Sequence, residues 1–185
     1  MLQKLDRSFF QRPATKVARD LIGTILVHRV GGEKLRARIV ETEAYLGPVD
    51  LASHASKGRT RRTEVMFGLA GHAYVYLIYG MYDMLNVVAG KTGSAHAVLL
   101  RAGEPLDGWE ADLSGPGKLA RDMRITRSHN GLDMTKQALT FWREPKDRCR
   151  ITRSRRIGVD YAQHWKEALL RFEDADSPAV SKRRK

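Results

Sequence analysis

The chain has 185 residues, 42% of them hydrophobic, which is enough for one domain with a real core and too short for two to be expected. Its single cysteine excludes an intramolecular disulfide, no apolar run approaches a membrane span, and the first residues lack a signal peptide's apolar core, so we expect a soluble intracellular protein. Lys and Arg number 33 against 21 Asp and Glu, and a net charge of +12 favours nucleic acid without choosing DNA or RNA.

The first predicted elements are a helix and a hairpin. Residues 14–22 carry apolar side chains on one helical face, and Gly23 ends the helix. Residues 24–30 are typical of a strand, and Gly31 and Gly32 turn the chain into a second strand.

Acidic residues continue that second strand. Apolar and basic residues alternate over 35–39, and the same alternation places Glu41, Glu43 and Tyr45 on the apolar side. Carboxylates there are costly unless they are paired, hydrogen-bonded or catalytic. A register break, or a bulge that turns the acids to solvent, would also fit, and the pattern alone leaves both interpretations open.

Residues 49–71 lack a regular pattern and carry His54 and a cluster of basic residues. The cluster consists of Lys57, Arg59, Arg61 and Arg62. A solvated loop and a loop that contacts phosphate both fit this composition.

Tyrosines and aliphatic residues fill 74–82, which predicts a strand. Gly80 permits a bend, so Tyr79 is expected at an exposed corner. Aromatic residues in a strand are commonly core residues, although in a basic protein they also stack on bases or wedge between them.

Further strands are predicted at 85–89 and 97–102. Arg101 is out of place in the second of these unless it has an acidic or anionic partner. A glycine-rich turn precedes a predicted helix at 119–125, and its backbone N–H groups beside Lys118 suit a DNA phosphate.

The last part of the chain is predicted to hold short strands at 139–142, 156–159 and 170–172 and a helix at 161–169. We place one domain at residues 1–173 and expect residues 174–185 to form a basic C-terminal tail that is partly disordered. The six histidines are scattered, so no metal site and no cofactor is expected, although Asp and Glu pairs able to hold Mg²⁺ keep a nuclease in view.

The motifs together resemble the alkyladenine (3-methyladenine, methylpurine) DNA glycosylase family. The resemblance covers essentially the whole chain in order, through VETEAYLGP at 40–48, YVYLIYGMY at 74–82, VLLRA at 98–102, SGPGKL at 114–119 and RIGV at 156–159. Residues 130–155 match least, and the chain is slightly longer than its relatives between Asn86 and Arg101.

This resemblance implies an α+β fold, a single compact domain with a curved antiparallel β-sheet surrounded by helices and a basic DNA-binding face. It implies a monomeric, intracellular, DNA-associated, monofunctional glycosylase that flips an alkylated or deaminated purine out of double-stranded DNA. Hydrolysis of the N-glycosidic bond by an activated water would then leave an abasic site, as in base excision repair.

The resemblance also implies roles for particular residues. Glu43 would be the general base for the water, with Arg101 and the Ile157 main chain helping to hold that water. Glu41 would be structural.

Base recognition and DNA binding complete the expected site. The resemblance places the base between Tyr45, His54 and Tyr76, next to backbone N–H groups around Ala52 and His54, with Asn86 clashing with the amino group of normal guanine. Tyr79, with Met81, would fill the gap in the stack, and the remaining expected phosphate contacts are Arg59, Arg61, Arg62 and Lys118. Three further functions stay open, namely a non-catalytic binder of distorted DNA, a metal-dependent nuclease, and a lyase that cuts through a Lys Schiff base.

Overall fold

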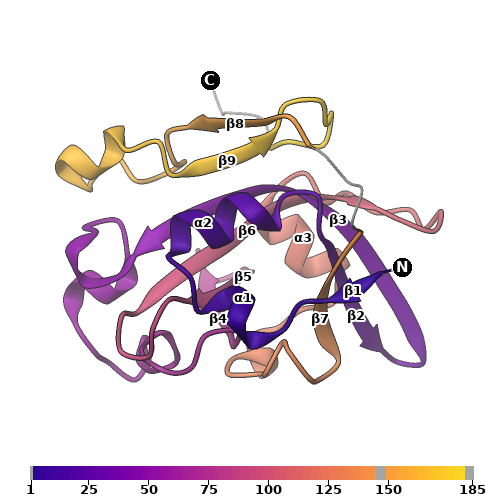
Figure 1. Ribbon diagram of the computed structural model, residues 1–185, viewed down its shortest axis with the longest axis horizontal. Helices are drawn as coiled ribbons and strands as arrows, with labels where there is room; N and C mark the ends of the chain where they lie inside the picture. The colour runs from indigo at the N-terminus through magenta and orange to yellow at the C-terminus, as the bar shows by residue number, and fades with distance from the viewer. Residues whose placement is uncertain (1, 145–148, 182–185) are drawn as a thin grey trace.

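The long strand β3 (Glu33–Leu46) is central to an antiparallel sheet in the computed structural model, which describes residues 2–144 and 149–181 (Figure 1). The sheet order is β1-β7-β2-β3-β6-β5-β4. In addition, β9 pairs with the second half of β3, and β8 pairs with β9. The other strands are β1 (Gln3–Lys4), β2 (Ile25–Val30), β4 (Ala73–Ile78), β5 (Tyr82–Ala89), β6 (His96–Pro105), β7 (Leu139–Arg143), β8 (Ile151–Ser154) and β9 (Arg171–Asp174).

Helical segments in the described residues are short. They are α1 (Arg7–Phe10), α2 (Ala14–Leu21), α3 (Pro116–Asp122) and the single turns η1 (Gly47–Val49), η2 (His54–Lys57), η3 (Glu64–Phe67), η4 (Arg127–His129) and η5 (Gln163–Glu167). The predicted class, α+β with one compact domain and an antiparallel sheet, is confirmed. None of these helices is both long and apolar enough to span a bilayer.

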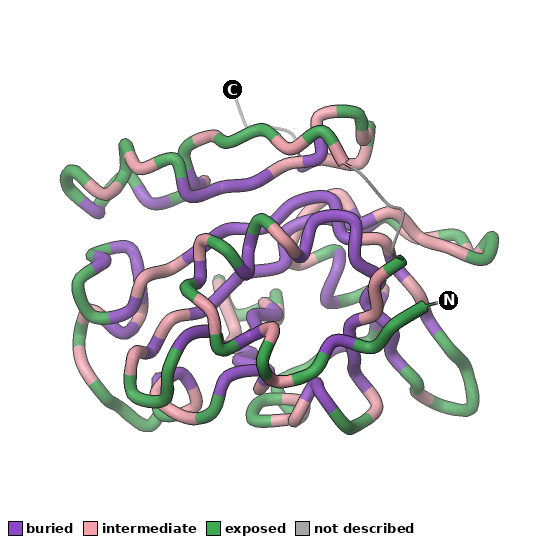
Figure 2. Tube along the Cα trace, viewed as in Figure 1, coloured by how far each residue is buried: buried purple, intermediate pink, exposed green. Residues whose placement is uncertain are grey.

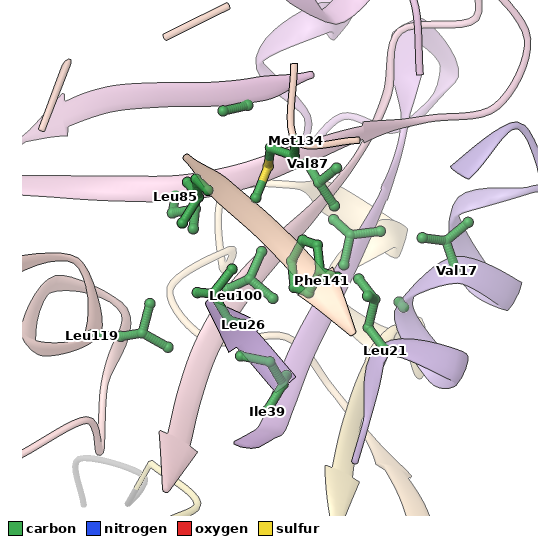
Figure 3. Packing of buried hydrophobic residues seen from close by; sticks show 14 of the residues in the cluster. Val17, Leu21, Leu26, Ile39, Leu85, Val87, Leu100, Leu119, Met134 and Phe141 are labelled. Carbon is green, nitrogen blue, oxygen red and sulfur yellow. The ribbon is translucent and has the colours of Figure 1, made fainter. Parts of the chain in front are cut away.

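One face of the sheet carries the main core. Helices α2 and α3 pack on this face, and buried residues line the middle of the trace (Figure 2). Leu21 of α2 packs here with Ile39 and Leu100 of the sheet and with Phe141 of β7 (Figure 3). Burying each such side chain contributes roughly 1.5–3 kcal/mol, so this face anchors the sheet while the other face stays available for polar groups.

Both predicted turns are present. Gly31 and Gly32 have φ of 59° and 80° and join β2 to β3. The predicted strand at 74–82 is in fact a hairpin, because a three-residue turn over 79–81, with Tyr79 (φ 54°) and Gly80 (φ 69°) at positive φ, joins β4 to β5. Tyr79 lies at the tip with 81% of its surface exposed, which confirms the expected exposed corner.

The alternation of β3 changes phase at Val40. The ladder between β3 and β6 skips Val40 on one strand and Arg101 on the other, which is a bulge on each. Thr42 therefore faces the core and donates its hydroxyl to a carbonyl of α2, while Glu43 faces the opposite side. The predicted shared side for apolar residues and acids is wrong, and the bulge turns the acids to a second buried face rather than to solvent.

The last part of the chain differs most from its prediction. Residues 156–159 form a loop rather than a strand, the predicted helix at 161–169 contains only η5, and β8 was not foreseen. The chain also stays packed beyond residue 173, since Asp174 and Ser181 are both buried. The basic residues 182–185 of the expected tail lie outside the described residues.

Candidate active site

Four neighbouring strands place polar and aromatic residues in one row on the face opposite the main core. Glu43 of β3 pairs with Leu99 of β6, Leu99 with Asn86 of β5, and Asn86 with Tyr74 of β4. Strands lie about 4.8 Å apart, so Glu43 and Asn86 are separated by roughly 10 Å along the row. Tyr45 and Tyr76 lie two residues further along β3 and β4, which run in opposite directions, so the two tyrosines flank the row on its two sides and the predicted site residues lie over one patch of sheet.

Glu43 is completely buried and held by three neighbours. Its Oε1 accepts a hydrogen bond from the Ile157 N–H at 2.8 Å, and its Oε2 accepts one from the Tyr45 hydroxyl at 2.8 Å. Nη1 of Arg101 lies 3.4 Å from Oε1. A buried carboxylate needs such partners, and together they fix the direction in which it points.

Arg101 bridges Glu41 and Glu43 of β3. Its Nε donates to Glu41 at 3.0 Å, while Nη1 lies beside Glu43. Burial alone would lower the pKa of Arg101, but the charges of Glu43 and Glu41 outweigh it and raise that pKa. The predicted anionic partner of Arg101 is therefore present twice, and the charge at the bulge of β6 is explained.

The Ile157 main chain contacts Glu43 itself. Its N–H holds the Glu43 carboxylate directly, so only its carbonyl is left to hold a water. The neighbouring Arg156 was not predicted to act at the site. Arg156 is fully buried, forms a double hydrogen bond with Asp50 at 2.6 and 2.9 Å, and lies 4.7 Å from the centre of the Tyr45 ring. This pair fixes the loop that brings Ile157 to Glu43.

Aromatic rings cluster beside the carboxylate. The His54 ring lies 4.5 Å from the Tyr76 ring in an edge-to-face arrangement, and its Nδ1 is 2.9 Å from the Tyr74 hydroxyl. Burial and the neighbouring Tyr74 and Glu43 raise the pKa of Tyr76. Burial and Glu43 likewise raise the pKa of Tyr45, so both tyrosines remain hydrogen-bond donors at neutral pH.

His54 is expected to remain neutral at physiological pH. Burial, together with the nearby charges of Arg62 and Lys57, lowers the pKa of His54 from 6.5 to about 4. This shift favours the folded state fully above pH 6.5, where the unfolded chain has also lost the proton, and the advantage is lost as pH falls through 4. Two-dimensional NMR of the imidazole should give a midpoint near 4, and a midpoint near 6.5 would contradict the packing of this ring.

Two hollows lie on this side of the molecule. One of about 380 Å³ is lined partly by Arg61, Arg62 and Tyr76, and one of about 240 Å³ is lined partly by His54, Arg62 and Tyr161. Glu43 lines neither hollow, and its side chain has no exposed surface. Tyr161, which borders the smaller hollow and donates to the Ala52 carbonyl at 3.3 Å, was not predicted by any sequence pattern.

The remaining predicted base contacts divide in two. The Ala52 N–H already donates to Asp50 at 3.0 Å, so it is not free to meet a base. No described residue accepts a hydrogen bond from the main-chain N–H of His54, so this donor is available to a base. Asn86 is buried, and its amide nitrogen donates to the Tyr74 carbonyl at 3.1 Å, which fixes the orientation of its side chain.

Two of the predicted DNA contacts lie beside this patch. Arg61 and Arg62 are exposed, and the Arg62 guanidinium lies 5.0 Å from the centre of the Tyr76 ring. Arg59 is also exposed, but it pairs with Glu64 at 3.5 Å. Lys118 donates to Asp112 at 2.6 Å, so its charge is already partly engaged.

Glu41 and Glu43 are both paired with Arg101. Among residues 2–144 and 149–181, no group of three His, Cys, Asp or Glu side chains is arranged to hold a metal ion. Glu41 and Glu43, the closest pair of carboxylates at the site, are both engaged by arginine.

A family model and several relatives match nearly the whole chain. The family described as Methylpurine-DNA glycosylase (MPG) matches residues 8–178. A protein of Anaeromyxobacter sp. (strain Fw109-5) is 52% identical over 97% of this chain and 93% of its own length, and one of Legionella pneumophila (strain Lens) is 49% identical over 98% and 100%. A protein of Methanocella arvoryzae is 48% identical over 97% and 96%. All three carry the words 3-methyladenine DNA glycosylase in their names.

Proposed function

Because the chain belongs to the methylpurine-DNA glycosylase family, and is therefore a hydrolase of N-glycosidic bonds in DNA repair, we propose that it flips a damaged purine out of duplex DNA and hydrolyses its bond to the sugar. The proposed substrates are alkylated and deaminated purines, and the product is an abasic site. The observation that supports this most is a fully buried carboxylate, Glu43, fixed by Arg101 beside a cluster of aromatic rings.

Glu43 is proposed as the general base. Hydrolysis needs a water behind the sugar C1′, on the face opposite the departing base, as in an inverting displacement. Glu43 takes the proton of that water and stabilises the positive charge that develops on the sugar. The Ile157 N–H and Arg101 hold the carboxylate so that it does not rotate away from this task.

Access of water to Glu43 requires a movement. The carboxylate has no exposed surface, and the Tyr45 hydroxyl occupies its Oε2. In our proposal, the Tyr45 ring shifts when the flipped base enters, and Oε2 then accepts the water in place of the hydroxyl. Solvent is thereby kept from the base catalyst until a substrate is bound.

The aromatic cluster is proposed to hold the base. Tyr45, Tyr76 and His54 offer ring faces and edges around the patch, and an alkylated purine is cationic at N3 or N7. A cation over an aromatic face gains roughly 0.5–2 kcal/mol, so these rings favour damaged over normal bases. A neutral His54 adds no repulsion to a cationic base.

Tyr79 is proposed to fill the gap that the flipped base leaves. Its ring is exposed at the tip of the β4–β5 hairpin, next to the exposed Met81, and its φ of 54° is uncommon for an aromatic residue. We expect Tyr79→Ala to slow excision from duplex DNA about tenfold, since base–aromatic stacking contributes roughly 1–3 kcal/mol. Excision from a single-stranded lesion should be unchanged, because no stack needs filling there.

Single-turnover rates on both substrates check this role, with Tyr79→Phe as the variant that keeps the ring. Equal losses on single-stranded and duplex DNA would contradict a wedge.

The proposed reaction is tested with a labelled duplex that contains one damaged base. Hypoxanthine, 7-methylguanine and 3-methyladenine duplexes are incubated with and without the protein and then treated with mild alkali, which cuts at abasic sites, and the sample without protein corrects for spontaneous loss of the alkylated bases. We expect cleavage at the lesion after alkali but not before it. An intact strand after alkali would indicate a non-catalytic binder of distorted DNA.

The same assay distinguishes a glycosylase from a nuclease and from a lyase. Unchanged excision in EDTA excludes the metal-dependent nuclease, and absence of a borohydride-trapped adduct excludes the lyase. Excision of the alkylated bases without excision of hypoxanthine would restrict the substrates to alkylated purines.

A further inference from the structure

A serine near the end of the described chain is buried against the catalytic strand. The Ser181 N–H donates to Oε2 of Glu41 at 2.6 Å, and the Ser181 hydroxyl donates to Oε1 of the same carboxylate at 2.8 Å. Its carbonyl accepts from Arg171 at 3.1 Å. Both Glu41 and Ser181 are buried, so no bulk water replaces these bonds.

Glu41 is linked through Arg101 to Glu43, the proposed catalytic carboxylate. Its Oε1 also accepts from Nε of Arg171 at 2.5 Å and from Nε of Arg101 at 3.0 Å. The other end of the Arg101 guanidinium lies 3.4 Å from Glu43. Because a guanidinium is a rigid plane, the position of Nε at Glu41 sets the position of Nη1 at Glu43.

We propose that Ser181 is a positioning residue that aligns Arg101, and through it Glu43, by fixing the Glu41 carboxylate. This inference rests on the proposed function and adds to it a contribution from the C-terminal segment. It assigns to Glu41 a task beyond neutralising charge, because the carboxylate has to stay at a set place as well as remain ionised.

The charges explain why Glu41 needs two donors from Ser181. Arg171 and Arg101 both pull on Oε1 of Glu41, whereas Ser181 supplies the only donor to Oε2 among the described residues. Arg171 is also held by Glu173 at 2.7 Å, so it stays in place when Glu41 moves. In Ser181→Ala the N–H still donates to Oε2, but Oε1 loses the hydroxyl and is placed by the two arginines alone, so the carboxylate shifts and Arg101 shifts with it.

Ser177 offers a matched control in the same segment. Its hydroxyl also donates to a carboxylate, that of Glu104, but Glu104 pairs with Arg38 and not with Arg101. Ser177→Ala therefore loosens the C-terminal segment without touching the line of contacts to Glu43. Ser181→Thr keeps both donors and serves as the conservative variant.

The experiment measures single-turnover excision and lesion-duplex affinity for the full-length unaltered protein, Ser181→Ala, Ser181→Thr and Ser177→Ala, with a thermal melt of each. Misplacing catalytic groups by about 1 Å costs roughly a hundredfold in rate. Because Glu41 keeps its other hydrogen bonds in Ser181→Ala, we expect a smaller shift and a slowing of excision on the order of tenfold. Its Kd for lesion DNA should change less than twofold. Ser181→Thr and Ser177→Ala should excise at the unaltered rate, even where Ser177→Ala lowers Tm.

The outcomes separate this role from the proposed function. Excision by the unaltered protein, with the same rate in Ser181→Ala, would overturn the positioning role alone. An equal slowing in Ser177→Ala, or a loss confined to Kd, would reduce Ser181 to a structural residue. Absence of excision by the unaltered protein would overturn the proposed function and this role with it.

Discussion

Replacement of Glu43 by glutamine is expected to reduce excision by roughly three orders of magnitude or more while lesion-DNA binding is retained. General base catalysis contributes about 10²–10⁴-fold, and the lost negative charge removes electrostatic stabilisation of the sugar cation in addition. Binding should survive because Glu43 lines neither hollow and the aromatic rings carry the base contacts in our proposal.

The substitution preserves the local hydrogen bonds. The amide oxygen of Gln can accept from the Ile157 N–H in place of Oε1, and the amide nitrogen can then donate to the Tyr45 oxygen. The variant should therefore fold, although Arg101 then keeps the charge of Glu41 alone as its acidic partner.

Single-turnover excision and fluorescence anisotropy on the same lesion duplex check this prediction. Glu43→Asp is a useful companion, because it keeps the charge but withdraws it by one methylene. We expect Glu43→Asp to fall between the unaltered protein and Glu43→Gln in rate. Near-normal excision by Glu43→Gln would show that another group activates the water.

Strand β3 shows what the sequence predicts about the candidate site and what it does not. The sequence predicted a strand here and left open whether its acids are buried. It also predicted an anionic partner for Arg101, which does contact both Glu41 and Glu43. Period-two alternation could not reveal that Val40 is skipped in the ladder, because a bulge depends on how two strands pair and not on one strand's pattern.

The sequence predicted the turns from local residues, but it did not predict contacts between residues far apart in the chain. The glycine pair at 31–32 and the Gly80 bend specify their turns through backbone conformation alone. Residues 156–159 look like a strand by composition, but Arg156 is drawn into a buried ion pair with Asp50, more than a hundred positions earlier. Such a tertiary contact overrides strand propensity and leaves no periodic signal.

Replacement of Asp50 by alanine is expected to destabilise the folded protein strongly. The carboxylate is fully buried, and it accepts from Leu46 N–H and Ala52 N–H as well as from both ends of the Arg156 guanidinium. Removing one partner of a buried pair leaves an uncompensated charge and costs about 3–5 kcal/mol. The neighbouring backbone N–H groups add to this cost.

Chemical denaturation followed by circular dichroism measures the change in unfolding free energy. The exposed pair of Arg150 and Asp176, 2.6 Å apart, provides a control of the same chemistry. Asp176→Ala should leave the unfolding free energy nearly unchanged, because exposed ion pairs are screened by solvent. For a domain of this size, the loss in Asp50→Ala corresponds to a decrease in Tm of roughly 10 °C.

A double-variant cycle distinguishes the ion pair from the other bonds of Asp50. Combining Asp50→Ala with Arg156→Met removes the stranded charge, so the double variant should be less destabilised than the sum of the two single changes. Its excision rate should still be low even when it is fully folded, since Arg156 leads directly into Ile157, whose N–H holds Glu43. Additive losses in the cycle would contradict the view that this buried pair stabilises the loop as a unit.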